Sequence, residues 1–174
     1  MRIAILTISD AGARGERADT SGDAIVDWAQ AKGYEVADRQ LVADDVVPIV
    51  TTLTGWTDRG PKEEVIDLVL TTGGTGLSPR DVTPEATRAV IEREAPGIAE
   101  RLRVLCLTSF PRAALSRGIS GTRGRTLIVN LPGSPNAVRD SLAALDPIVD
   151  HAVAILTGAV TDHGSRSALS AQRR

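Results

Sequence analysis

The stretch at 65–87 reads VIDLVLTTGGTGLSPRDVTPEAT, and it joins a run of aliphatic residues to a helix start through a turn rich in glycine. The aliphatic residues predict a buried strand at 65–72, because strands covered by helices on both faces carry nearly continuous apolar sequence. A helix is expected from Pro84 to about Glu94, since proline suits the first helical position and Thr83 is a good N-cap residue. A strand, a turn and a helix in close succession are typical of α/β folds.

The rest of the chain repeats this alternation of strands and helices. Strands are expected at 2–9 and 35–42 and as a hairpin within 118–131 that turns near Arg123–Gly124, and helices at 21–32, 45–58, 96–105, 134–145 and 147–157. Thr20 or Ser21 can cap the first of these helices and Asp44 the second, and residues 55–64 are expected to form a surface loop. This order predicts a three-layer α/β/α sandwich with a mostly parallel sheet and a small antiparallel hairpin at one edge.

The composition favours one domain, at 1–158, followed by a polar C-terminal tail at 159–174. The 174 residues are 42% hydrophobic but only 2% aromatic, which argues against nucleic-acid binding by base stacking, and the net charge of −2 gives no basic surface. Cys106 is the only cysteine, so neither an intramolecular disulfide nor a cysteine-based zinc site can form. No apolar run approaches the ~18 residues of a membrane span, and a cytoplasmic protein without a membrane partner is expected.

Three of the expected strands end in loops that are polar or rich in glycine. These loops are TISD at 7–10, TTGGTG at 71–76 and NLPGSPN at 130–136. Parallel strands end at the same edge of a sheet, where α/β proteins bind their ligands, so the three loops should meet there. Glycines let backbone N–H groups approach an anion closely. The sequence therefore predicts an anion site at this edge, and the 18 arginines among its 20 cations are suited to support it.

Known catalytic and phosphate motifs fit the sequence poorly. A Walker loop requires Gly-Lys-Ser/Thr, but Leu77 follows the last glycine of the turn, and the glycines after the first strand lack the dinucleotide-binding spacing. A serine–histidine triad and a histidine metal site are disfavoured, because the only histidines lie in a helix and in the tail. Carboxylates remain, and Asp10, Asp44 and Asp81 each follow a strand, where they can hold Mg²⁺ together or serve singly as caps. The residues alone point to a phosphorylated small molecule without naming it.

TTGGTGLSPRDVTPEAT at 71–87, together with LSRGISGTRGRTLIVNLPGSPNAV at 115–138, resembles the MogA/MoaB family of molybdenum-cofactor biosynthesis, which includes the G domain of gephyrin. The resemblance implies Mg²⁺-dependent transfer of AMP from ATP to the terminal phosphate of molybdopterin, with release of pyrophosphate. It also implies a homotrimer, with a hexamer as the other assembly, and a downstream molybdenum-insertion protein. The catalytic aspartates of the family match Asp44 and Asp81, which are also the expected Mg²⁺ ligands, although the neighbouring Asp45 leaves the first assignment open by one residue. The expected substrate- and nucleotide-binding residues are Ser9, Asp10, Gly73, Gly74, Thr75, Gly76, Ser116, Asn130, Pro132, Gly133 and Ser134.

Two other functions fit parts of the sequence. A non-catalytic MoaB-type protein could bind or scaffold molybdopterin on the same fold, although the presence of Asp44, Asp81 and the whole glycine turn favours the enzyme. A nucleotide-using enzyme unrelated to molybdenum, such as a phosphotransferase, fits the rim of anion loops but not the two long motifs. Measurement of AMP transfer separates the first alternative from the enzyme, and the ligand retained on purification identifies the second.

Overall fold

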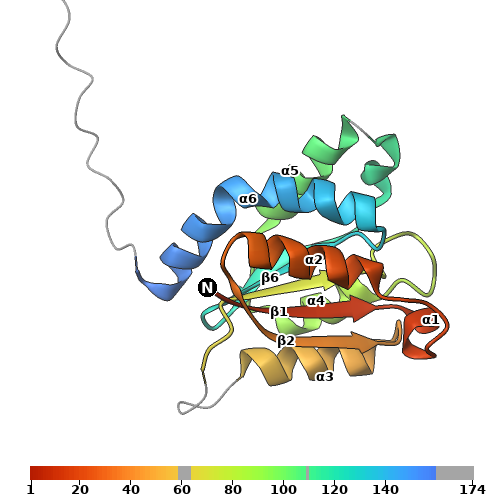
Figure 1. Cartoon of the computed structure of the whole chain (residues 1–174), viewed down its shortest axis with the longest axis horizontal. Helices are drawn as coiled ribbons and strands as arrows, with labels where there is room; N and C mark the ends of the chain where they lie inside the picture. Colours follow the sequence, from red (N-terminus) through yellow and green to blue (C-terminus); the bar gives the residue numbers. More distant parts are fainter. Residues whose placement is uncertain (59–63, 109, 160–174) are drawn as a thin grey trace, which may run out of the picture.

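A six-stranded sheet forms the centre of the protein, in a computed structural model that describes residues 1–58, 64–108 and 110–159 (Figure 1). The strand order is β2-β1-β3-β6-β5-β4. The strands are β1 (Arg2–Ile8), β2 (Glu35–Val42), β3 (Leu68–Thr72), β4 (Arg93–Glu94), β5 (Ser120–Arg123) and β6 (Thr126–Leu131). The first four in spatial order are parallel, whereas β5 pairs antiparallel with both of its neighbours. This arrangement confirms the predicted parallel sheet with an antiparallel hairpin at one edge.

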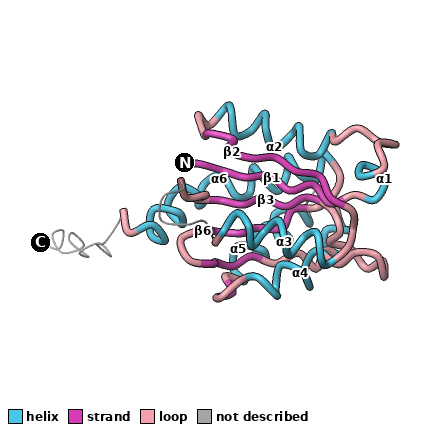
Figure 2. Tube along the Cα trace, turned by 90° about the horizontal axis from the view of Figure 1, so that it is seen from below, coloured by secondary structure: helices cyan, strands magenta, loops and turns pink. Residues whose placement is uncertain are grey.

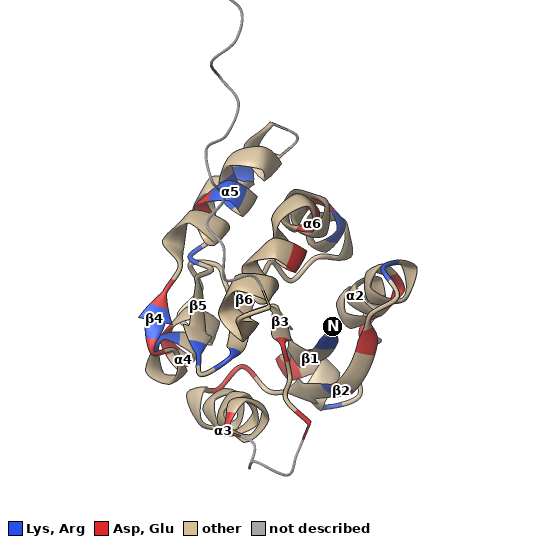
Figure 3. Cartoon of the chain, turned by 90° about the vertical axis from the view of Figure 1, so that its left-hand side faces the viewer, with Lys and Arg blue, Asp and Glu red and all other residues tan. Residues whose placement is uncertain are grey.

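Helices cover both faces of the sheet, which confirms the three-layer sandwich. On one face lie α2 (Thr20–Ala31), α5 (Pro96–Leu107) and α6 (Pro135–Thr157), and on the other α3 (Val46–Thr57) and α4 (Thr83–Val90) (Figure 3). Two short elements, α1 (Asp10–Ala13) and the 3-10 helix η1 (Pro111–Leu115), were not expected from the sequence. Viewed from below, β2, β1, β3 and β6 run side by side in that order (Figure 2). None of the described helices is long and apolar enough to cross a membrane.

The central strands β1, β3 and β6 bury both of their faces, which explains their largely apolar sequence. Successive residues of β1 point in opposite directions, so that Ile3 and Ile5 pack beneath α2, α5 and α6, while Ala4 and Leu6 pack against α3 and α4. All four side chains are completely buried. The sheet is therefore held rigidly between two hydrophobic layers, and its C-terminal edge presents loops from a fixed frame.

The C-terminal helix is a single element, and the predicted break before Pro147 is wrong. Proline inside a helix removes one hydrogen bond and costs about 3 kcal/mol. Here α6 continues from Pro135 to Thr157 because its apolar face is anchored on both sides of the proline, with Leu145 and Val149 fully buried in the core. Gly158 ends the helix with a left-handed φ of 76°. Residues 160–174 of the predicted tail lie outside the described residues.

Several other boundaries differ from the expected ones. The strand predicted at 65–72 begins only at Leu68, and the helix expected to reach Glu94 ends at Val90, where the chain turns into β4. The helix expected at 96–105 continues to Leu107. The surface loop predicted at 55–64 is wrong at its start, because α3 continues to Thr57, while 59–63 lie outside the described residues. Trp56 is buried there, and its indole N–H donates to Asp38 at 2.7 Å.

Three predicted helix caps are replaced by neighbouring residues. Asp19 caps α2 through the N–H of Gly22, in place of Thr20 or Ser21. Asp45 caps α3, in place of Asp44, and so leaves the Asp44 carboxylate available for other contacts. Thr83 is the first residue of α4 rather than its cap. At α2 and α3 the sequence identified the turn correctly, but which of the adjacent polar side chains reaches the helix N–H groups depends on tertiary contacts; α4 has Val82 at its N-cap and no side-chain cap.

Candidate active site

The loop at 73–76 follows β3 at the C-terminal edge of the sheet, and the protein binds all four of its carbonyl oxygens. Thr83 binds the first two, through its hydroxyl at 2.9 Å and its backbone N–H at 3.1 Å. Arg117 binds the last two, through its backbone N–H at 2.8 Å and its Nε–H at 2.7 Å. The carbonyl side of the loop is thus occupied by protein donors.

Most N–H groups of the same loop, unlike its carbonyl oxygens, are not taken up by hydrogen bonds in the part of the chain that the structure describes. Within the described ranges, no acceptor is hydrogen-bonded to the N–H groups of Gly74, Thr75 and Gly76. The backbone is left-handed at Gly73, with φ of 101°, and at Gly74, with φ of 60°. Successive N–H groups on such a backbone form a nest that binds anions. The predicted glycine turn therefore has the geometry of a phosphate cradle.

Asp44 and Asp81 lie against this loop. A Cβ atom on Gly74 would be 2.7 Å from Oδ1 of Asp44, and one on Gly76 would be 2.7 Å from Oδ2 of Asp81. Asp44 Oδ1 also accepts the N–H of Val82 at 3.3 Å. The two aspartates come from loops after different strands, as predicted, and the glycines without side chains leave room for both carboxylates. Their catalytic roles remain predictions.

Burial, hydrogen bonds and neighbouring charges shift the pKa values of Asp44 and Asp10 in opposite directions. Partial burial, opposed by the N–H of Val82, and then the nearby negative charges of Asp81 and Asp10 raise the pKa of Asp44. The hydrogen bond from Arg80, with that from the backbone N–H of Asp44, lowers the pKa of Asp10. Asp44 is therefore a carboxylate whose negative charge is opposed by its surroundings, and a cation placed beside it would relieve that repulsion.

Two cavities meet at the glycine loop. The larger has a volume of about 610 Å³ and is lined by Asp81, and the smaller has about 250 Å³ and is lined by Ser9, Asp10 and Asp44. Gly74 and Gly133 line both. The other predicted substrate residues on the wall of the larger cavity are Thr75, Gly76, Ser116, Asn130, Pro132 and Ser134, while Gly73 lies on the wall of the smaller one.

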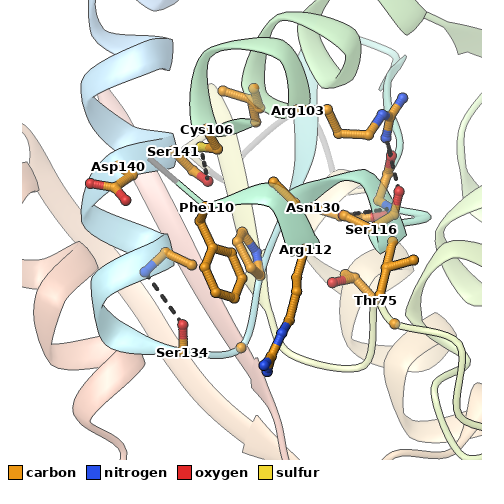
Figure 4. Close-up of a pocket in the computed structure, with 18 of the residues that line it drawn as sticks. Thr75, Arg103, Cys106, Phe110, Arg112, Ser116, Asn130, Ser134, Asp140 and Ser141 are labelled. Atoms are coloured by element: carbon orange, nitrogen blue, oxygen red, sulfur yellow. Dashed lines mark hydrogen bonds between the residues drawn. The ribbon is translucent and has the colours of Figure 1, made fainter. Parts of the chain in front are cut away.

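The larger cavity has an apolar wall and a polar wall (Figure 4). Cys106 and Phe110 come from the end of α5 and the segment after it, and Ala99 and Leu102 add apolar surface from the same helix. Thr75, from the loop at 73–76, lies across the cavity from Phe110, and Ser134 adds a hydroxyl that caps α6 by accepting the N–H of Ala137 at 3.4 Å. The positive end of a long helix thus borders the cavity, which further favours anions.

Asn130 is held by the protein itself. Its Oδ1 accepts the N–H of Ile119 at 3.2 Å, and its Nδ2 donates to the hydroxyls of Thr71 and Thr87, both at 2.9 Å. The residue is only 4% exposed. Sequence reasoning predicted a substrate contact here, and the structure shows in addition that this carboxamide connects β3, α4 and the segment before β5.

The structure also reveals residues that the sequence analysis did not select. Thr83 and Arg117 orient the glycine loop, as described above, and Arg80 forms an ion pair with Asp10 at 2.7 Å. Arg112 lines the larger cavity and stacks on Phe110, with its guanidinium carbon 5.9 Å from the ring centroid. The clearest sequence signal was for Arg117, which lies inside the LSRG motif next to Ser116.

The number of carboxylates near the glycine loop indicates how a divalent metal could bind there. Among the described residues, no group of three or more His, Cys, Asp or Glu side chains could hold a metal ion. Asp44 and Asp81 can supply two carboxylates, and Mg²⁺ commonly binds through one or two carboxylates plus water and substrate phosphates. The residues therefore fit Mg²⁺ that arrives with a phosphorylated substrate, rather than a metal caged by protein.

Comparisons with known proteins identify the family of the chain. The family described as a probable molybdopterin binding domain matches residues 4–151. The chain is 37% identical over 160 residues to a molybdopterin adenylyltransferase of Helicobacter pylori, and the match covers 91% of this chain and 89% of the relative. It is 40% identical over 157 residues to the molybdenum cofactor synthesis protein cinnamon of Drosophila melanogaster, covering 87% of this chain but only 25% of that longer protein.

A solved structure leads to the same family. The molybdopterin biosynthesis enzyme MoaB from Thermus thermophilus superposes with a TM-score of 0.83 at 52% sequence identity, over 90% of this chain and 96% of that one. The superposition covers 90% of this chain. The chain belongs to the MogA/MoaB family of molybdopterin-binding proteins.

Proposed function

We propose that the protein is a molybdopterin adenylyltransferase, which transfers AMP from ATP to the terminal phosphate of molybdopterin and releases pyrophosphate. The observation that carries the proposal is the glycine loop, whose free N–H groups lie between Asp44 and Asp81 and between two cavities. Two adjoining cavities with a shared wall suit a reaction that joins two phosphorylated molecules. The 37% identity to a molybdopterin adenylyltransferase of Helicobacter pylori supports the same activity.

The substrates would meet at the wall that the two cavities share. Each substrate carries a heteroaromatic ring system and a phosphate, and the apolar wall around Leu102 and Phe110 suits such a ring. The free N–H groups of Gly74, Thr75 and Gly76 would bind phosphate oxygens and stabilise the charge that develops on them in the transition state. No nucleophilic side chain is needed, because an oxygen of the molybdopterin phosphate attacks the α-phosphorus of ATP and pyrophosphate leaves with the bonding electrons.

Mg²⁺ is part of this proposal. Two unit charges 4 Å apart repel by about 4 kcal/mol at an effective dielectric constant near 20, so two phosphate groups resist approach. When bound, Mg²⁺ supplies charge neutralisation to the triphosphate and to the departing pyrophosphate. Asp44 and Asp81 would hold it, directly or through water. Support for this role comes from the raised pKa of Asp44, which follows from partial burial and from the charges of Asp81 and Asp10.

The assembly, location and partners are also proposals. We expect a homotrimer, with a hexamer as the other assembly, and the exposed apolar residues Val104, Leu105 and Leu107 on α5 offer a surface for self-association. Multi-angle light scattering of the purified chain distinguishes these states from a monomer. The adenylylated product would pass to a downstream molybdenum-insertion protein in the cytoplasm. We propose that residues 1–158 form the single functional domain.

The decisive experiment incubates the purified protein with MgATP and molybdopterin and follows both products. Mass spectrometry should detect adenylyl-molybdopterin, and a coupled assay should detect pyrophosphate in equal amount. Binding of molybdopterin without transfer would instead support the non-catalytic, scaffolding alternative. A nucleotide without any pterin among the ligands retained on purification would support a nucleotide-using enzyme outside the molybdenum pathway.

A further inference from the structure

Arg117 is surrounded by residues of the larger cavity but does not itself line it. Its neighbours Ser116 and Gly118 form part of the cavity wall. The Arg117 guanidinium instead lies behind the glycine loop, with about a third of its side chain exposed. An arginine next to a phosphate cradle would ordinarily be assigned to substrate binding. The contacts of Arg117 point to another role.

All three guanidinium nitrogens of Arg117 have partners within the protein. Nε donates to Gly76 O at 2.7 Å, Nη2 donates to Asp81 O at 2.5 Å, and Nη1 pairs with the carboxylate of Glu85. The backbone N–H of Arg117 also donates to Thr75 O at 2.8 Å. The charge of Arg117 is therefore already paired with Glu85, and a substrate phosphate would have to break these bonds to use it.

The two carbonyls on the guanidinium stand at the two ends of one loop. Gly76 begins and Asp81 ends the stretch GLSPRD, whose middle residues, at 77–80, are exposed. The Asp81 carboxylate folds back over the beginning of this loop, where Oδ2 accepts the N–H of Ser78 at 3.2 Å and would be 2.7 Å from a Cβ atom on Gly76. The position of Asp81 therefore depends on Arg117, which holds the two ends of the loop together through the carbonyls of Gly76 and Asp81.

We infer that Arg117 is a positioning residue of the proposed adenylyl transfer. It holds the carbonyls of Thr75, Gly76 and Asp81, so that the free N–H groups of the loop and the Asp81 carboxylate stay arranged around the phosphates. Only arginine can do this, because its planar guanidinium directs donors to two carbonyls and one carboxylate at once, whereas a lysine ammonium is a single point donor. The inference rests on the proposed function.

Three substitutions test the inference. Arg117→Lys keeps the positive charge but cannot donate to the carbonyls of Gly76 and Asp81 at the same time. Glu85→Gln removes the charge of the carboxylate partner while leaving the bonds from Arg117 to Gly76 and Asp81. Arg123→Lys is the matched control, since Arg123 pairs with the Asp58 carboxylate and donates to one carbonyl, that of Val90, in another part of the fold.

We expect Arg117→Lys to lower kcat about 10- to 100-fold, because small displacements of catalytic groups have effects of this size. Glu85→Gln and Arg123→Lys should stay within about threefold of the wild-type rate, since a half-exposed ion pair contributes little. The melting temperature of each variant is measured alongside. Activity losses that follow the melting temperatures equally in all three variants would overturn the inference, because the role of Arg117 would then be structural only.

A binding measurement keeps the inference separate from the proposed activity. Inorganic pyrophosphate is titrated into ¹⁵N-labelled protein, and the amide signals of Gly74, Thr75 and Gly76 are followed by NMR. Wild type and Glu85→Gln should bind with similar affinity and Arg117→Lys at least about fivefold more weakly. Unchanged affinity in Arg117→Lys, or loop signals that do not respond in the wild type, would contradict the inference. A wild type that binds pyrophosphate at these amides but transfers no AMP would overturn only the proposed function.

Discussion

Asp10 is joined to Asp44 by a hydrogen bond: its Oδ1 accepts the backbone N–H of Asp44 at 3.0 Å, while its Oδ2 pairs with Arg80 at 2.7 Å. Asp10 thereby connects the loop after β2 to the residue that precedes Asp81. Together with the bond from Val82 N–H to Asp44, this contact holds the two proposed catalytic aspartates in a defined relation. The loops that carry them are therefore fixed to each other by hydrogen bonds within the protein.

Replacement of Asp81 by asparagine should abolish adenylyl transfer and leave molybdopterin binding nearly intact. Asparagine has almost the same shape but lacks the charge needed to hold Mg²⁺, so we expect kcat to fall at least about 100-fold. The dissociation constant for molybdopterin should change less than about threefold. Asp140→Asn removes another carboxylate from the larger cavity and serves as the control, with near-normal turnover expected. Equal rates for Asp81→Asn and wild type would remove the proposed metal role.

Replacement of Asp44 by asparagine should reduce activity and raise stability at neutral pH. Because the pKa of Asp44 is raised in the folded state, by partial burial and then by Asp81 and Asp10, the folded protein holds this proton more tightly than the unfolded chain. The charge of Asp44 therefore destabilises the fold above that raised pKa, and the penalty disappears as pH falls below the unfolded pKa. The carboxylate is partly exposed, so screening should limit the gain in melting temperature to about 2 °C.

The pH dependence of the melting temperature checks this sign. The difference between Asp44→Asn and wild type should be positive at neutral pH and vanish near pH ~3, below the ordinary pKa of an aspartate, because Asp44 is then neutral in both states. Asp58→Asn should show the opposite sign, because the hydrogen bonds from Arg123 lower the pKa of Asp58. A melting temperature of Asp44→Asn below that of the wild type at neutral pH would contradict the expectation.

Truncation of Asn130 to alanine should destabilise the fold. It would leave the N–H of Ile119 and the hydroxyls of Thr71 and Thr87 without their partner in a buried place. We expect a loss of about 2–4 kcal/mol in the free energy of unfolding, measured by urea denaturation. Asn136→Ala, at an exposed position on the same cavity, should cost less than about 0.5 kcal/mol. A stable Asn130→Ala variant with a raised KM would show instead that this carboxamide acts mainly on substrate.

An alanine at position 74 should damage both the fold and the site. Its Cβ would lie 2.4 Å from the Thr83 hydroxyl and 2.7 Å from Asp44 Oδ1. Gly33→Ala is a matched control, since Gly33 has a similar left-handed φ of 69° but nothing within 4 Å of a new Cβ. The control should lose roughly 1–2 kcal/mol of stability, and Gly74→Ala should lose more and show no measurable transfer. Equal stability losses and retained activity would contradict the crowding at Gly74.

The sheet and the rim of the site could be predicted because their signals are local. Continuous aliphatic runs specify the buried strands, and the glycine turn at 73–76 specifies its own unusual backbone. The position of Asp44 and Asp81 after two parallel strands likewise predicts that they lie at the same edge of the sheet. These features depend on residues that are close in the sequence or on the fixed rule that parallel strands end at one edge.

The remaining features depend on contacts between distant segments. Nothing near Pro147 in the sequence shows that the core would carry α6 through it, and the choice of Asp45 over Asp44 as a cap follows from the contact between Asp44 and Val82. Arg117 lies 41 residues from Gly76, and their bond becomes visible only when the loops are assembled. The sequence predicted the groups of the candidate site, and the structure adds the hydrogen bonds that hold them in place.

The partition at Gly74 and Gly133 is made of backbone alone, and a Cβ on Gly133 would already lie 3.1 Å from the Cα of Gly73. A bulky side chain here would instead crowd the wall that the two cavities share. A condensed product that occupied both cavities would be held at both of its ends, and its release would require both sets of contacts to break. Such a molecule should therefore depart more slowly than either of its precursors, and would remain on the protein until the next component of the pathway collects it.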